Sequence, residues 1–141
     1  MKKSQRIKPI KNLAEEQEKQ AARALGQSRQ LLVNCQLRLQ ELNEYRNDYV
    51  ERFNAQGSMG MSGSRIQSFQ TFISQLDSAI DRQKQLVSAA EDQCRVMQQD
   101  WNRRHMRTKA LGKTVQRYET QEHKQQEKHA QREADDRVYV R

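Results

Sequence analysis

Three histidines and two cysteines are the side chains that could bind a metal or act as nucleophiles. His105, His123 and His129 lie 18 and 6 residues apart, so no pair has the i,i+4 spacing that places two imidazoles on one face of a helix. The cysteines, Cys35 and Cys94, form no Cys-x-x-Cys motif. The sequence therefore predicts no metal site and no cofactor.

The sequence also lacks a convincing catalytic carboxylate pair, a phosphate-binding loop and a nucleophile motif. Asp135 and Asp136 are adjacent, but they fall in a C-terminal tail that we expect to be frayed. The chain contains neither the G-x-x-x-x-G-K-[ST] phosphate loop nor the G-x-S-x-G nucleophile motif. We predict that the protein is not an enzyme.

The composition is that of a helical protein with a thin core. Of 141 residues, 34% are hydrophobic and 31% charged, with one proline and five glycines. A compact globular domain usually contains about 45–50% apolar residues. Two helices that share one apolar seam need fewer.

Apolar residues recur alternately four and three residues apart, as in a coiled coil. In the N-terminal half this predicts a helix over about residues 10–54, with Pro9 in its first turn. Its seam positions are Ala14, Glu18, Ala21, Leu25, Ser28, Leu32, Cys35, Leu39, Leu42, Arg46, Tyr49 and Phe53.

A glycine-rich segment separates this helix from a second one. Residues 55–64 contain three glycines and predict a turn, after which Ser64 could cap the next helix. The second helix is expected over about residues 65–132, with a frayed tail at 133–141. Its seam positions are Ile66, Phe69, Ile73, Leu76, Ile80, Gln83, Val87, Ala90, Cys94, Met97, Trp101, Arg104, Thr108, Leu111, Val115 and Tyr118.

The predicted fold is all-α, a long antiparallel two-helix coiled-coil hairpin that forms a single domain over residues 1–141. Two amphipathic helices joined by a short turn pack antiparallel. The register then brings Leu42 and Leu76 together across the seam and places Cys35 opposite about Lys84. The two cysteines are about ten residues out of step, too far apart for a disulfide.

Positive charge gathers toward both chain ends. Residues 1–11 hold five Lys/Arg and no acid, and residues 103–132 hold nine Lys/Arg and three acids. A hairpin brings these segments together as one basic end. This end could be a solvated face, a site for nucleic-acid phosphates, or a surface that enters an acidic cavity of a protein partner. Base-stacking aromatic residues are sparse there, because Trp101 and Tyr118 lie on the seam.

A second stripe of apolar residues runs beside the seam near the turn, at Tyr45, Phe72 and Ala79. Partly exposed aromatic residues are typical of a contact surface. Alternatively, long neighbouring side chains cover the stripe, or the helices rotate to bury it. Dimerisation through the stripe is also possible.

The chain start has no apolar signal-peptide core, and no stretch approaches a membrane span. We therefore expect a cytoplasmic protein with reduced cysteines.

In length and pattern the sequence resembles the flagellar export-apparatus stalk family, FliJ. The resemblance covers nearly the whole chain. It is carried by the basic start Lys2 to Lys11, Leu13-Ala14-Glu15, the Leu42/Tyr45/Tyr49/Phe53 run, the short turn, Phe72/Leu76/Ala79 and the isolated Trp101.

The resemblance implies a non-enzymatic stalk and general chaperone component of flagellar type III protein export, with roles in motility and chemotaxis. Its paired termini would bind and regulate a hexameric export ATPase, and its turn-side half would bind the cytoplasmic domain of the membrane export gate. It would also bind export chaperones, and would associate with the inner-membrane apparatus only through its partners.

Carried over by position, the gate surface would consist of Leu42, Tyr45, Tyr49, Phe72, Leu76 and Ala79. The family provides no match by position for the ATPase end. Its basic residues are taken from the charge pattern: Lys2, Lys3, Arg6, Lys8, Lys11, Arg103, Arg104, Arg107, Lys109, Lys113 and Arg117.

Two alternatives remain open at this stage. One is a basic coiled coil that binds nucleic acid, which the scarcity of aromatic residues at the basic end disfavours. The other is the equivalent stalk of a virulence secretion system, which the sequence separates poorly from a flagellar one.

Overall fold

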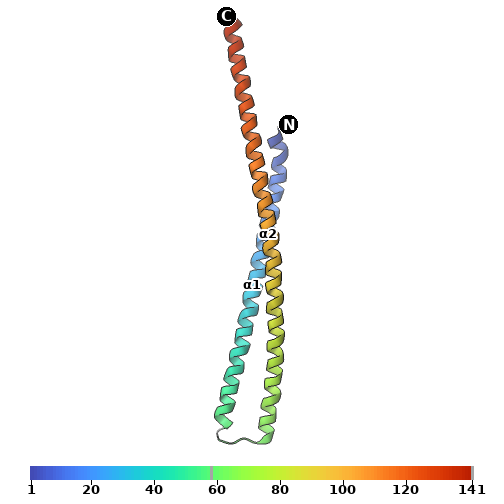
Figure 1. The fold of residues 1–141 in the computed structure, drawn as a ribbon, viewed down its shortest axis with the longest axis vertical. Helices are drawn as coiled ribbons and strands as arrows, with labels where there is room; N and C mark the ends of the chain where they lie inside the picture. The colour runs from blue at the N-terminus through green and yellow to red at the C-terminus, as the bar shows by residue number, and fades with distance from the viewer. Residues whose placement is uncertain (58, 141) are drawn as a thin grey trace. The chain divides into compact units, whose positions relative to one another are not determined.

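Two long helices make up the computed structural model, which describes residues 1–57 and 59–140. Helix α1 spans Lys3–Gly57 and helix α2 spans Gly63–Val140. They run antiparallel and pack against each other as a hairpin (Figure 1), and the described residues contain no strand. The predicted all-α hairpin is confirmed.

The seam predicted from the coiled-coil spacing is the buried face of both helices. All twelve seam positions of α1 are buried or half-buried, as are fifteen of the sixteen on α2. The exception is Ile66, 40% exposed in the first turn of α2. The most enclosed apolar side chains are small or aliphatic, among them Ala14, Ala21 and Ile80. A seam between only two helices has no second layer to enclose anything larger.

Helix α1 begins earlier than predicted, at Lys3 rather than near residue 10. The Lys2 N–H donates to Gln5 Oε1 at 3.2 Å, which satisfies one of the free amide groups of the first turn. The Ser4 N–H donates to Glu122 Oε1 on α2 at 3.1 Å. Pro9 therefore lies inside the helix rather than in its first turn. The sequence prediction failed here because polar contacts, and not apolar ones, hold these turns.

Helix α2 ends later than predicted. It continues to Val140, through the segment 133–140 that we expected to be frayed. No proline or glycine follows Gly112, so nothing in the sequence terminates the helix. Side chains at 123–139 are all exposed. The last residue of the predicted tail, Arg141, lies outside the described residues.

The turn between the helices depends on Gly60 and Ser62. Gly60 has φ of 88°, a left-handed conformation that glycine adopts without steric cost. Ser62, and not Ser64 as predicted, caps α2, because its hydroxyl accepts the Arg65 N–H at 3.3 Å. Ser64 already lies within α2. Ser58, part of the predicted turn, lies outside the described residues.

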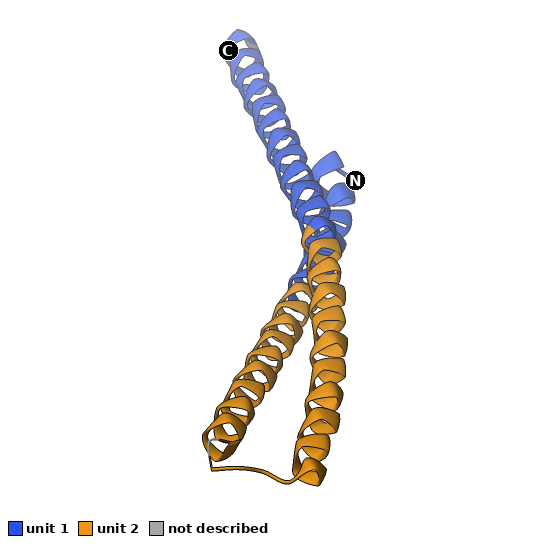
Figure 2. Ribbon diagram, turned by 60° about the horizontal axis from the view of Figure 1, so that its bottom comes forward, with its two compact units in different colours: residues 1–23, 99–141 blue, residues 24–98 orange. Residues whose placement is uncertain are grey.

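Contacts between the helices gather into two compact units, which the single-domain prediction did not separate. Unit 1 consists of residues 1–23 and 99–141, and unit 2 of residues 24–98 (Figure 2). Each unit contains a segment of both helices.

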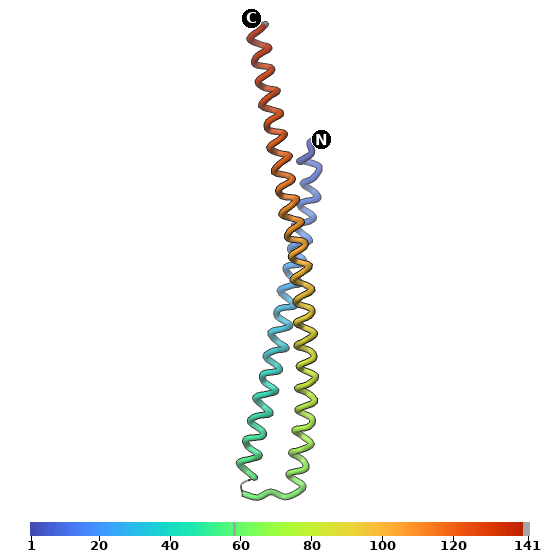
Figure 3. Tube along the Cα trace, in the orientation of Figure 1, coloured from blue at the N-terminus to red at the C-terminus, as the bar shows by residue number. Residues whose placement is uncertain are grey.

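Within unit 2 the size of the seam side chains changes along the helices. Leu25, Ser28 and Ala90 are buried at one end. At the loop end, Phe69 stacks on Phe53 and Tyr49, with ring centroids 3.6 and 5.5 Å apart. The two helix segments of this unit diverge toward the loop (Figures 1 and 3). Aromatic rings need more space between the backbones than alanine and serine, which accounts for the divergence.

Candidate functional site

Unit 2 carries a groove beside the seam that is partly lined by aromatic residues. Its volume is about 490 Å³, and its lining residues are Arg38, Glu41, Leu42, Tyr45, Phe72 and Leu76. The Tyr45 ring meets the edge of Phe72, with centroids 6.1 Å apart at 75°. Tyr45 stays 53% exposed despite this contact. The groove thus presents apolar surface and a phenol to the solvent.

All six predicted gate residues lie in unit 2, and four of them, Leu42, Tyr45, Phe72 and Leu76, line the groove, whereas Tyr49 and Ala79 do not. The exposure of the six differs: Tyr45 is exposed, Leu76 is only 8% exposed, and the other four are half-buried. Phe72 packs against Tyr49 with centroids 4.5 Å apart, which covers part of both rings. Leu42 and Leu76, predicted to meet, line the same groove. A partner would therefore contact Tyr45 most directly, while Leu76 chiefly stabilises the hairpin.

On the flank opposite the groove, polar side chains bridge the helices of unit 2: Asp77, Arg29 and Gln98 each follow a seam position by one residue, whereas Tyr45 and Phe72 each precede one. Arg46 Nε donates to Asp77 Oδ1 at 2.6 Å, and this bond raises the pKa of the Arg46 guanidinium. Arg29 donates to Gln98 Oε1 at 2.7 Å. The two flanks of this unit therefore differ in character, one cross-linked by polar contacts and one apolar and open.

Another polar contact fixes the register of unit 2. Gln83 Nε2 donates to the Cys35 carbonyl at 2.9 Å, one residue from the predicted facing position Lys84. Cys35 and Cys94 are both free thiols.

Unit 1 holds the whole net charge of the protein. It contains eighteen Lys/Arg and ten Asp/Glu, while unit 2 contains eight of each. All eleven predicted ATPase-end residues lie in unit 1. Lys11 and Arg104 are half-buried and the other nine are exposed.

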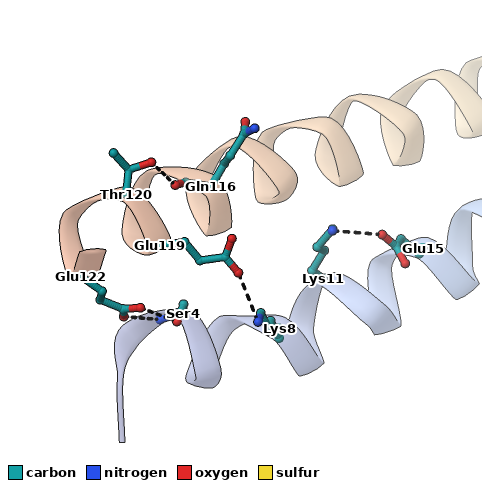
Figure 4. A network of polar contacts seen from close by, with 8 residues as sticks. All are labelled: Ser4, Lys8, Lys11, Glu15, Gln116, Glu119, Thr120 and Glu122. Carbon is teal, nitrogen blue, oxygen red and sulfur yellow. Dashed lines mark hydrogen bonds and ion pairs between the residues drawn. The ribbon is translucent and has the colours of Figure 1, made fainter. Parts of the chain in front are cut away.

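Some of these cations are already neutralised by neighbours (Figure 4). Lys8 Nζ lies 3.1 Å from Glu119 on the other helix, and Lys11 Nζ lies 3.5 Å from Glu15. Beside them, Glu122 accepts hydrogen bonds from the Ser4 hydroxyl and N–H, which lower the pKa of its carboxyl group. This network joins the first turns of α1 to α2.

An arginine-rich groove lies further along unit 1. Arg103, Arg104 and Arg107 line it with Asp100, Ala14 and Gln17. Asp100 pairs with Arg104 at 3.1 Å and with Arg103 at 3.5 Å. Arg107 makes no hydrogen bond or ion pair with any residue that the structure describes, so this groove keeps uncompensated positive charge.

A hydrogen-bonded cluster that was not predicted from the sequence lies in the seam of unit 1. His105 Nδ1 lies 2.6 Å from Glu18 Oε1, and its ring stacks on Trp101 with centroids 4.7 Å apart. The bond to His105 lowers the pKa of the Glu18 carboxyl group. The signal was present, since Glu18 is a carboxylate at a seam position.

Metal chemistry and membrane insertion find no support in the described part of the chain. No group of three or more His, Cys, Asp or Glu side chains gathers there in a way that could hold a metal ion. Neither helix, as far as it is described, contains a stretch long and apolar enough to cross a bilayer.

A hairpin of two long helices, with one basic unit and one neutral unit carrying an apolar groove, belongs to the class of all-α coiled-coil proteins. Comparison with known families is specific: residues 2–140 match the model of the flagellar FliJ protein, and the chain belongs to this family. It is therefore a component of the flagellar export apparatus.

Two relatives illustrate how far the similarity extends. The chain is 28% identical over 111 residues to the flagellar FliJ protein of Escherichia coli K12, covering 79% of this chain and 76% of the relative. It is 26% identical over 104 residues to the flagellar FliJ protein of Salmonella typhi, covering 74% and 71%. No solved structure matches the chain.

Proposed function

We propose that the protein is a non-enzymatic stalk of the export apparatus that binds two partners through its two units. Unit 1 would bind the export ATPase hexamer, and unit 2 the cytoplasmic domain of the export gate. The observation that carries the proposal is the division of surface chemistry. The net charge of +8 lies in unit 1, and the open aromatic groove lies in unit 2, which has no net charge.

Unit 1 suits a partner with an acidic cavity. Charged surfaces steer association and set specificity more than they supply affinity. The unpaired Arg107 and the exposed Arg103 offer guanidinium groups that a partner's carboxylates can bind in bidentate fashion.

Unit 2 suits a partner with an apolar contact surface. Tyrosine is enriched among the residues that dominate binding energy, and Tyr45 lies exposed at the rim of a groove. The gate would be this partner, as the resemblance implied for the turn-side half of the hairpin. Export chaperones would bind the same protein as further partners. Contact with the inner-membrane apparatus would come through these partners, in the cytoplasm.

The rate of ATP hydrolysis by the purified export ATPase, titrated with this protein at physiological salt, tests the role of unit 1. We expect the full chain to stimulate turnover and the double variant Arg103→Gln/Arg107→Gln to stimulate it several-fold less. Arg38→Gln/Arg82→Gln is the matched control, because it removes two arginines from unit 2. Equal stimulation by both double variants would contradict the assignment of unit 1.

Nucleic-acid binding is the competing function for the basic unit. Unit 1 offers few rings for base stacking: Trp101 and Tyr118 are half-buried, Trp101 already stacks on His105, and Tyr139 is the exposed one of these three. Failure of the ATPase titration, together with duplex binding that falls linearly on a log–log plot against salt, would favour this alternative.

A further inference from the structure

We infer that the gate-binding face of unit 2 extends away from the loop, beyond the aromatic groove, to include Leu31 and Leu86. This inference rests on the proposed function, because it takes the partner to be the cytoplasmic domain of the export gate. It adds two residues that the family resemblance did not provide.

The first observation is spacing. Leu31 precedes Tyr45 by fourteen residues in α1, and Leu86 follows Phe72 by fourteen in α2. Two heptads return a coiled-coil position to the same face. Since the helices run antiparallel, moving back along α1 and forward along α2 goes in the same direction along the unit. Leu31 and Leu86 therefore occupy the positions that correspond to the contacting pair Tyr45 and Phe72.

The second observation is exposure. Leu31 is 52% exposed and Leu86 is 55% exposed, close to the 53% of Tyr45. Single exposed leucines are common on protein surfaces and need no explanation. These two lie on one flank, in register with the groove, and exposed apolar side chains that recur on one face are typical of a contact surface.

The third observation is the asymmetry between the flanks. On the other flank of unit 2, Asp77 accepts a hydrogen bond from the seam residue Arg46, and Arg29 donates one to Gln98. No such polar bridge links the helices through Leu31, Tyr45, Phe72 or Leu86 in the described structure. The polar flank is thus satisfied within the hairpin, whereas the apolar flank is left for a partner.

Charge indicates the chemistry of the occupant. Unit 2 has no net charge, so its partner is not held by bulk electrostatics. Arg38 lies halfway along α1 between Leu31 and Tyr45 and occupies the same heptad position as both. It lines the groove, and its ion pair is with the exposed Glu41 at 3.4 Å. An apolar surface bearing one carboxylate, placed to meet Arg38, would complement this face.

The test is the affinity of the full-length protein for the purified gate cytoplasmic domain, measured by isothermal titration calorimetry. We expect Leu31→Ala and Leu86→Ala each to weaken binding about three- to tenfold, as expected for truncating one interface side chain, and Tyr45→Ala to weaken it more. Leu37→Ala is the matched control. Leu37 is also a leucine of α1, also 52% exposed, but it lies two residues from both Cys35 and Leu39 and so projects away from the seam. It should bind like the unsubstituted protein.

The outcomes separate this inference from the proposed function. If Tyr45→Ala weakens binding while Leu31→Ala and Leu86→Ala match the control, the extension is wrong and the gate-binding role stands. If Tyr45→Ala has no effect either, both are wrong. Helical content, measured by circular dichroism, should be unchanged in all four variants, and the unfolding temperature should fall by no more than a few degrees, because each side chain is more than half exposed.

Discussion

Tyr45 and Leu76 line one groove, but the structure gives them different tasks. Tyr45 is exposed, while Leu76 is 8% exposed on the seam. A position-by-position transfer from the family assigns both residues to the same gate surface. The four-and-three spacing separates them, because Leu76 is a seam position and Tyr45 lies beside the seam.

Truncating these two side chains should therefore separate stability from binding. We expect Leu76→Ala to lower the free energy of unfolding by about 2–3 kcal/mol, the lower part of the range for buried leucines, because this seam can relax. Tyr45→Ala should lower it by less than about 1 kcal/mol. Urea unfolding followed by circular dichroism measures both. Equal losses would place Tyr45 in the core and remove the main support for a binding face.

Glu18 makes the stability of unit 1 depend on pH. Its bond to His105 lowers its pKa below the ordinary 4.5, so the folded state binds this proton less readily than the unfolded state. The resulting stability is fully present above about pH 4.5 and is lost as the pH falls through the lower folded value. Glu122, held by Ser4, acts in the same direction.

Thermal melts of the protein and of Glu18→Gln at about pH 6 and about pH 3 test this effect. At the higher pH the variant should melt a few degrees lower. At the lower pH the two curves should approach each other, because the stabilisation from Glu18 is lost as the pH falls toward its lowered pKa. A difference that stays constant over this range would show that the carboxylate charge contributes nothing.

At the scale of the helices, the sequence was sufficient for the seam and insufficient for the ends. The four-and-three spacing identified nearly every buried position because burial repeats with the helical period. The helix termini depend on single contacts, such as Ser4 with Glu122 and Ser62 with Arg65. A pattern read along one helix carries no information about a partner more than a hundred residues away.

Gly26 is a point where α1 can be strengthened. A Cβ built there meets no atom within 4 Å, and glycine in a helix costs about 0.5–1 kcal/mol relative to alanine. Gly26→Ala should therefore raise the free energy of unfolding by about this amount, measured by urea denaturation. Gly60→Ala should lower it, because Gly60 has φ of 88°. A destabilising Gly26→Ala would reveal a close approach that the structure does not contain.

For the molecule as a whole, the main feature is the unequal division of charge between the units. The sequence showed the excess of basic residues near both termini, and the antiparallel fold joined them in unit 1. It could not show which cations remain unpaired. That depends on neighbours such as Glu119 for Lys8 and Asp100 for Arg104.

This division predicts two different responses to salt. Raising NaCl from about 0.05 to about 0.5 M shortens the screening length from roughly 14 to roughly 4 Å. The affinity of the protein for the export ATPase should then fall at least tenfold, while its affinity for the gate domain should change less than threefold. Surface plasmon resonance at several salt concentrations measures both. Equal salt dependence would contradict the assignment of the charged and apolar surfaces to different partners.

Simultaneous binding of both partners tests the central claim most directly. The gate cytoplasmic domain would be immobilised, and capture of the soluble export ATPase measured with and without this protein. We predict that capture of the ATPase requires the protein. Tyr45→Ala should reduce capture because the protein then binds the gate domain less tightly, and Arg103→Gln/Arg107→Gln should reduce it because the protein then binds the ATPase less tightly. If the ATPase instead releases the protein from the gate, both partners use one surface, and the account of two units with two separate tasks is wrong.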